Sequence, residues 1–224
     1  MTDERFNKIF DVASRMFIQQ GYARTQMNHI AKAAGIAVGS MYNLFESKEA
    51  VYGFVLKCII APDYMESQFS IPVKERDFAE LEEEIISAFE NNSKEFDKHQ
   101  DEVATGYDFE NMISDAFDIV SKYARGCLIF EHNIKDHEEL VEHYRQFRSH
   151  FFTSVYEYLK LFEERGTIRK IEDLKLAARF VIEAISYWTM NLPYHSFDVQ
   201  EEISAETAKK VVMDALVHAY GLRT

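Results

Sequence analysis

The sequence predicts an all-α fold, and three observations lead to this prediction. Apolar residues recur at intervals of three and four along most of the 224 residues, as on the buried faces of helices. Apolar side chains make up 47% of the chain, which is enough for a sizeable core. Gly35 separates two short apolar patterns, which is typical of two helices joined by a tight turn.

The first expected helix covers residues 3–20 and ends at Gly21. Its apolar positions share one helical face and are Phe6, Ile9, Phe10, Ala13 and Phe17. Thr25 is placed to cap the second helix, which runs to about Ala34, with its hydroxyl on a free backbone N–H. These two helices precede the turn at Gly35.

A short third helix, from about Val38 to Leu44, is expected after the turn, because Gly35 tolerates the left-handed conformation that such a turn requires. Ser47 is placed to cap a fourth helix, and Pro62 stops it. The inner face of this fourth helix is expected to be Val51, Phe54, Val55 and Cys58.

We therefore divide the chain into a three-helix helix-turn-helix domain at 1–47, a bridging helix at 47–61 and a larger helical domain at 62–224. The connector 62–75 is expected to be partly helical. Further helices are expected at 76–98, 106–123, 125–133, 136–165, 173–192 and 204–221.

The last two expected helices each carry a face of apolar and small residues. On the first helix these are Leu174, Ala177, Val181, Ile185, Trp188 and Leu192, and on the second they are Ala208, Val212, Ala215 and Ala219. Two interpretations stay open: a pair of core helices, or half of a four-helix bundle completed by a second subunit. The second interpretation gives an interface of Ala177, Val181, Ile185, Ala208, Val212, Ala215 and Ala219.

The net charge of −13 is distributed unevenly. Residues 1–50 carry six Lys and Arg against five Asp and Glu, whereas the remaining 174 residues carry 19 against 33. A nucleic acid is bound through local basic and amide donors, and an acidic remainder limits nonspecific binding to phosphate. The asymmetry is therefore compatible with a DNA-binding N-terminal domain.

Cys58 and Cys127 each stand alone in an apolar run without metal-ligand spacing, which favours buried thiols and a reducing compartment. No window approaches the ~18 apolar residues of a membrane span, and the acidic start lacks the layout of a signal peptide. We expect a soluble, cytoplasmic protein that does not bind membranes.

The first fifty or so residues resemble the TetR family of bacterial transcriptional regulators. The matching positions are Ile9, Ala13, Phe17, Gly21, Tyr22, Thr25, Ile30, Ala31, Ala34, Gly35, Gly39, Tyr42, Phe45, Lys48 and Glu49. The remainder resembles the family in being helical, in its length and in the run Gly166, Ile168, Arg169 and Asp173. The resemblance implies a DNA-binding N-terminal domain and a C-terminal domain that holds a small-molecule pocket and dimerises through its last two helices.

The positions at which this family contacts operator DNA correspond to Thr25, Gly39, Ser40, Tyr42, Asn43 and Lys48. At Gly39 the backbone can approach the duplex closely, while Ser40 and Asn43 can hydrogen-bond to base edges or phosphates. Two positions depart from the family pattern. Ala37 stands where a small hydroxyl residue commonly caps the recognition helix, and Leu44, where His or Tyr is common, is a candidate for contact with a thymine methyl group.

The larger domain is rich in aromatic residues, which are suited to line a small-molecule pocket but are also typical of a plain helical core. Our candidates for pocket residues are Met112, Phe117, Phe151, Tyr187 and Trp188. They favour a hydrophobic or aromatic effector.

A cluster of potential metal ligands comprises Glu131, His132, His137, Glu138, Glu142 and His143. Its spacing differs from the His pair of the HExxH motif, so a polar helix start is the favoured interpretation and a metal site the alternative. No nucleophile, phosphate-loop or dinucleotide motif is present in the sequence, and we expect neither catalytic residues nor a cofactor.

Together these observations predict a homodimer that binds a palindromic operator in double-stranded DNA, as a repressor released by a small molecule. Two alternatives stay open. The chain could be a helical protein with metal-dependent or enzymatic activity at 131–143, or a structural DNA-binding protein without an effector.

Overall fold

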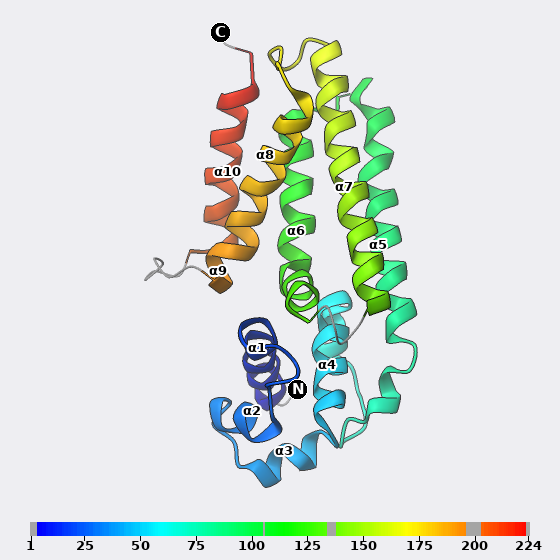
Figure 1. The fold of residues 1–224 in the computed structure, drawn as a ribbon, viewed down its shortest axis with the longest axis vertical. Coiled ribbons are helices and arrows are strands. Elements are labelled where there is room, and N and C mark those ends of the chain that lie inside the picture. Colours follow the sequence, from blue (N-terminus) through cyan, green and yellow to red (C-terminus); the bar gives the residue numbers. More distant parts are fainter. Residues whose placement is uncertain (1–3, 105, 134–137, 196–202, 223–224) are drawn as a thin grey trace. The chain divides into compact units, whose positions relative to one another are not determined.

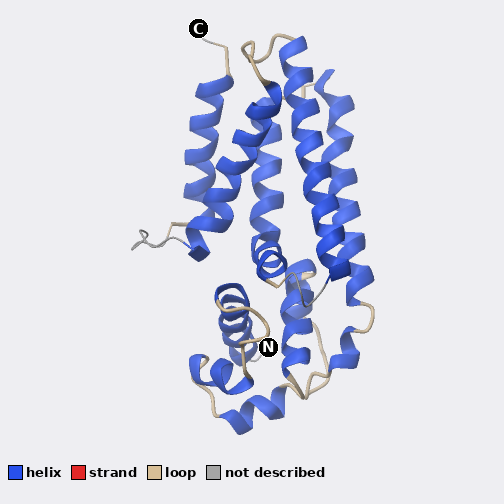
Figure 2. Ribbon diagram, in the orientation of Figure 1, coloured by secondary structure: helices blue, strands red, loops and turns tan. Residues whose placement is uncertain are grey.

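A computed structural model of the chain describes residues 4–104, 106–133, 138–195 and 203–222 (Figures 1 and 2). Within these ranges all regular elements are helical, and extended pairing is limited to two isolated bridges. The predicted all-α class is confirmed. The chain divides into two compact units, with Met1–Ala88 and Arg125–Glu142 forming unit 1 and Phe89–Ala124 and His143–Thr224 forming unit 2. The functional boundaries at 47 and 62 stay a prediction.

Unit 1 begins with four helices close to their expected positions (Figure 1). They are α1 (Glu4–Gln19), α2 (Met27–Ala33), α3 (Val38–Leu44) and α4 (Lys48–Ile60). Gly21 and Gly35 have φ values of +82° and +70°, which explains why glycine follows α1 and α2. Ser47 caps α4 as expected, since its hydroxyl accepts a hydrogen bond from the Ala50 N–H at 3.1 Å.

The predicted cap of α2 is wrong. Gln26 occupies the cap position and its side chain makes no cap hydrogen bond. The Thr25 hydroxyl instead donates to the Gly21 carbonyl at 2.8 Å and accepts from the Gln20 amide at 3.2 Å. Thr25 is fully buried, so it fastens the loop between α1 and α2.

Aromatic rings form much of the core of unit 1. The rings of Phe6, Phe45 and Phe54 lie with centroids 5.2–5.6 Å apart. The four predicted inner positions of α4 are buried, among them Cys58, and burial raises the pKa of its thiol to about 12. α4 is thus packed along this face, as its sequence pattern predicts.

After α4 the chain forms two short 3₁₀ helices, η1 (Pro62–Glu66) and η2 (Glu75–Phe78), so the connector is partly helical as expected. The later elements are α5 (Leu81–Asp97), the 3₁₀ helix η3 (Lys98–Ala104), α6 (Phe109–His132), α7 (Glu138–Glu164), α8 (Leu174–Ser186), the π-helical turn η4 (Tyr187–Asn191), α9 (Leu192–His195) and α10 (Ala205–Tyr220). Among the described residues, no helix is long and apolar enough to cross a membrane.

Three predicted boundaries are corrected. The expected helices at 106–123 and 125–133 are one continuous helix, α6, in which Gly126 is tolerated next to Ile59. The helix expected at 76–98 begins only at Leu81, because η2 precedes it. The helix expected at 173–192 changes to π-helical geometry at Tyr187.

The inner faces of α8 and α10 pack into the core of unit 2. Five residues predicted to meet a second subunit lie in this core, each at most 7% exposed: Ala177, Val181, Ile185, Ala208 and Val212. Their assignment to a dimer interface is wrong, because neighbouring helices of the same chain already cover them. Ala215 and Ala219 are exposed on α10.

Candidate nucleic-acid interface

α3 has one buried and one exposed face. Met41 and Leu44 point into the core of unit 1, whereas Gly39, Tyr42 and Asn43 are exposed and Ser40 is half-buried. Tyr42 is 52% exposed, so it lies on the outer face of the helix. The outer face of α3 therefore presents the bare backbone of Gly39, the phenol of Tyr42 and the amide of Asn43. Such groups can bind phosphates and base edges.

Leu44 does not belong to this outer face. Its side chain is 2% exposed, and its carbonyl accepts a hydrogen bond from the Val73 N–H at 2.8 Å. A side chain in this position cannot reach a thymine methyl group. The expected contact by Leu44 is wrong because Leu44 lies one helical turn after Met41, on the same buried face.

Thr25 also lacks the exposure that a phosphate contact through its hydroxyl requires, since it is fully buried. Gly39 has open space around it: apart from its chain neighbours and its own helix backbone, no atom of the described residues lies within 4 Å of a Cβ placed there. The described part of the chain therefore leaves room for a larger side chain at this position. Its small size fits the close approach of a molecule from outside.

The start of α3 has no side-chain cap. Ala37 occupies the cap position in extended conformation, with φ −67° and ψ 143°, and an alanine offers no side-chain acceptor. This departure from the family pattern is thus visible in the structure. The N–H groups of the first turn of a helix have no partner within the helix and can bind an anion.

Lys48, at the start of α4, is held by Tyr22. Its ammonium donates to the Tyr22 carbonyl at 2.9 Å and lies 3.9 Å from the centroid of the Tyr22 ring. The Tyr22 hydroxyl donates to Glu49 Oε1 at 2.7 Å, and this hydrogen bond lowers the pKa of Glu49. Lys48 is half-buried, so its charge is oriented but still reaches the surface.

Asn133 fastens the loop between α1 and α2 from a distant part of the sequence. Its Oδ1 accepts from the Tyr22 N–H at 2.5 Å, and its Nδ2 donates to the carbonyls of Phe17 at 3.2 Å and Ile129 at 2.6 Å. The side chain is buried, and all three partners belong to unit 1. Our sequence analysis missed Asn133, because nothing in its local sequence indicates a partner more than a hundred residues away.

The His/Glu cluster at 131–143 lies partly outside the described residues, since His137 is not described. His132 Nδ1 contacts the Ile18 carbonyl. Among the described residues, no group of three His, Cys, Asp or Glu side chains could hold a metal ion.

Three of the five expected pocket residues meet in the core of unit 2, namely Met112, Phe117 and Phe151. Trp188 is partly buried against this core. Tyr187, the first residue of η4, is 49% exposed and does not join them. A pocket lined by these side chains stays a prediction.

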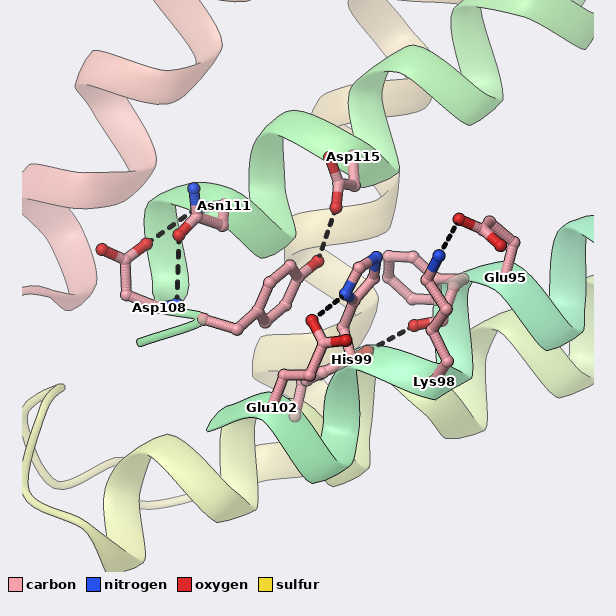
Figure 3. A network of polar contacts seen from close by, with 10 residues as sticks. Glu95, Lys98, His99, Glu102, Asp108, Asn111 and Asp115 are labelled. Carbon is pink, nitrogen blue, oxygen red and sulfur yellow. Dashed lines mark hydrogen bonds and ion pairs between the residues drawn. The ribbon is translucent and has the colours of Figure 1, made fainter. Parts of the chain in front are cut away.

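Polar groups border the same core, at η3 and the start of α6 (Figure 3). The Tyr107 hydroxyl donates to Asp115 Oδ2 at 2.9 Å, and the His99 ring stacks on the Tyr107 ring at 4.6 Å. Glu102 accepts from His99 at 2.5 Å. Burial, and then Asp115, raise the pKa of Tyr107, so the phenol stays protonated and able to donate.

The geometry of α2, the turn at Gly35 and α3 defines the class of protein as one with an N-terminal helix-turn-helix domain. Residues 9–53 match the model of a family described as bacterial regulatory proteins, tetR family. The N-terminal domain of this chain is therefore of the TetR type.

Curated relatives match the same N-terminal region. The chain is 38% identical over 53 residues to the transcriptional repressor KstR2 of Rhodococcus jostii, covering 24% of this chain and 26% of that protein. It is 37% identical over 59 residues to IcaR of Staphylococcus aureus, a negative transcriptional regulator of the biofilm operon icaADBC, covering 26% and 31%. The matches thus span less than a third of the length of these relatives.

Solved structures match the fold over nearly the whole chain. The ketosteroid transcriptional regulator KstR2 of Mycobacterium tuberculosis superposes with a TM-score of 0.58 at 14% identity, covering 100% of this chain and 97% of that one. The probable transcriptional regulatory protein RHA5900 superposes with a TM-score of 0.53 at 19% identity, covering 98% and 99%. At these identities the likeness establishes the fold alone.

Proposed function

We propose that this protein is a sequence-specific DNA-binding transcriptional regulator, and specifically a repressor that a small molecule releases from its operator. The observation that carries the proposal is the outer face of α3, where Gly39, Tyr42 and Asn43 are exposed beside a buried face that fixes the helix. Ser40 and Lys48 complete the proposed DNA-contacting set. Because its target is chromosomal DNA, we place the protein in the cytoplasm.

A second copy of the chain is the partner that we propose for the outer faces of α8 and α10. Leu176, Phe180 and Tyr187 on the α8 side are 68%, 59% and 49% exposed, and their spacing places them on one helical face. Val211 is 44% exposed on α10, where Ala215 and Ala219 continue the same face. Large exposed apolar groups on neighbouring helices are typical of a subunit interface.

Such a dimer would present two recognition helices to a palindromic operator. Half-sites one helical turn apart, about 34–36 Å, or a multiple of this distance, follow from the geometry of dimeric helix-turn-helix proteins. The operator is therefore expected to be an inverted repeat. The dimer remains part of the proposal.

The effector is proposed to bind in unit 2, at the core formed by Met112, Phe117 and Phe151. An aromatic core bordered by Tyr107 and Asp115 suits a mainly hydrophobic or aromatic molecule with one hydrogen-bonding group. Release follows if the effector binds more tightly to the conformation that cannot engage both half-sites, because the populations then shift away from DNA.

Selection from a random double-stranded DNA library tests the function. We expect the selection to enrich an inverted repeat. The protein should lose its affinity for this repeat when Tyr42→Ala and Lys48→Ala are combined, since both side chains belong to the proposed DNA-contacting set. Lys160→Ala is the control, because it also removes one lysine charge but lies on α7, away from the proposed DNA-contacting set. The absence of any enriched sequence would contradict the proposal.

A further inference from the structure

The segment Pro62–Phe78, called the strap below, packs across the helix-turn-helix part of unit 1. Its Phe69 ring meets the rings of Phe6 and Phe54, with centroids 4.9 and 5.8 Å away. Phe78 lies so close to Gly53 on α4 that a Cβ on Gly53 would be 2.7 Å from Phe78 Cγ. The strap is thus seated on both α1 and α4 by aromatic side chains.

Between these two aromatic contacts, the strap pairs with the end of α3. The Val73 N–H donates to the Leu44 carbonyl at 2.8 Å, and the Glu46 N–H donates to the Val73 carbonyl at 3.0 Å. These bonds form an isolated parallel bridge between Phe45 and Val73, and Val73 is fully buried. The Glu75 N–H also donates to Glu46 Oε1 at 2.9 Å.

α3 needs such support because its own sequence stabilises it weakly. A helix of seven residues is too short to be stable alone, since isolated helices below about 12 residues are marginal in water. Ala37 provides no side-chain cap at its start. The order of α3 therefore depends on its buried side chains and on what holds its last turn.

We propose that the strap is a positioning element of the recognition helix, and that the hydrogen bond from the Glu75 N–H to Glu46 contributes to operator affinity without touching DNA. This inference rests on the proposed function. If α3 is loosened, only those molecules in which it is correctly placed can bind the operator. The apparent dissociation constant for the operator rises as the fraction of such molecules falls.

Glu46 offers a matched pair of variants. Glu46→Gln and Glu46→Ala both remove one negative charge, but only the glutamine keeps an oxygen that can accept from Glu75. The affinity for an operator selected from a random duplex library is measured by fluorescence polarisation at fixed salt. We expect Glu46→Ala to bind about three- to tenfold more weakly than Glu46→Gln, in line with the loss of one hydrogen bond.

Glu75 tests the same bond from the strap. Proline fits this position, since Glu75 is the first residue of η2 and Lys74 before it is extended, with φ −116° and ψ 154°. Glu75→Pro removes the donor N–H, while Glu75→Ala removes the same carboxylate and keeps the donor. We expect Glu75→Pro to bind DNA more weakly than Glu75→Ala, with faster hydrogen exchange at the Glu46 N–H.

The outcomes separate the two levels of the proposal. If the wild type binds its operator and the members of each pair bind equally, the strap does not position α3 for DNA. If the wild type binds no duplex selectively, the proposed function itself fails. Weaker binding of Glu46→Ala and Glu75→Pro than of their controls supports the inference.

Discussion

The exposed faces of α3 and α8 differ in chemistry and in what holds each helix. α3 is a seven-residue helix that exposes Gly39, Tyr42 and Asn43, and it depends on neighbouring segments for its order. α8 has thirteen residues, begins with a cap in which Asp173 accepts from the Leu176 N–H at 3.0 Å, and exposes large apolar side chains. The first face suits a hydrated, charged polymer, and the second suits another apolar protein surface.

The two faces therefore suit different roles in the proposed function. A surface that reads DNA must present polar groups in fixed positions, and α3 is held by the strap and by the packing of Met41. A surface that joins two subunits needs buried apolar area, which a long regular helix supplies. The predictions below are arranged by the size of the expected effect on these two faces.

The largest effect is expected at the apolar face. Phe180→Asp should raise the dissociation constant of the dimer roughly a thousandfold, because losing a buried aromatic anchor costs about 2 kcal/mol and a two-fold interface carries it twice. Sedimentation equilibrium measures the change. Lys175→Asp on the same helix is the control, since it introduces the same residue outside the proposed contact. A Phe180→Asp variant that stays dimeric would show that this face is not the interface.

At the polar face, Asn43→Ala should weaken operator binding about tenfold, because a lost base contact costs about 1–3 kcal/mol. The side chain is exposed, so unfolding stability should change by less than about 0.5 kcal/mol. Polarisation titrations and urea unfolding give the two numbers. Asn91→Ala on α5 should change neither. If Asn43→Ala and the wild type bind the operator with equal affinity, Asn43 does not contact its bases.

Substitutions at the starts of α3 and α4 should change the free energy of unfolding by a smaller amount, and in opposite directions. Ser47→Ala removes the cap of α4 and should cost about 1 kcal/mol of unfolding stability. Ala37→Ser places an acceptor at the extended cap position of α3 and should stabilise the protein by up to about 1 kcal/mol. Urea unfolding of both variants measures this. A destabilising Ala37→Ser would mean that the start of α3 is not free to accept a cap.

The smallest effect is a pH dependence at Tyr22 and Glu49. The hydrogen bond lowers the folded pKa of Glu49 below its ordinary value of 4.5, so its stabilisation is present above that pH and is lost as pH falls through the folded pKa. Tyr22→Phe should therefore be less stable than wild type at neutral pH, and the difference should shrink on acidification. When Glu49→Gln is also present, the difference in unfolding stability between Tyr22 and Tyr22→Phe should stay constant with pH. If that difference still varies with pH, the pH dependence comes from another group.

Local patterns in the sequence predicted the helices of unit 1 well. Val38 and Leu44 bound α3 as expected, because Gly35 and the spacing of Met41 and Phe45 leave few alternatives. Thr25 was misplaced because its hydroxyl has a nearer acceptor, the Gly21 carbonyl four residues back. Leu44 could have been placed correctly, since it lies three residues after the buried Met41.

The sequence could not show which apolar face of α8 turns inward. Ala177, Val181 and Ile185 form one apolar face and Leu176 with Phe180 another, and only packing against other helices selects between them. Asn133 and the strap were missed for a related reason. Their partners lie far away in the sequence, so no periodicity or spacing indicates them.

The most direct test of the account is a salt-dependent polarisation titration with the selected inverted repeat and with a duplex that contains only one half-site. We predict two chains per inverted repeat, much weaker binding to the single half-site, and an affinity that falls steeply with salt as phosphate counterions are released. One chain per duplex, equal binding to both duplexes, or an affinity insensitive to salt would contradict a dimer that reads DNA through α3.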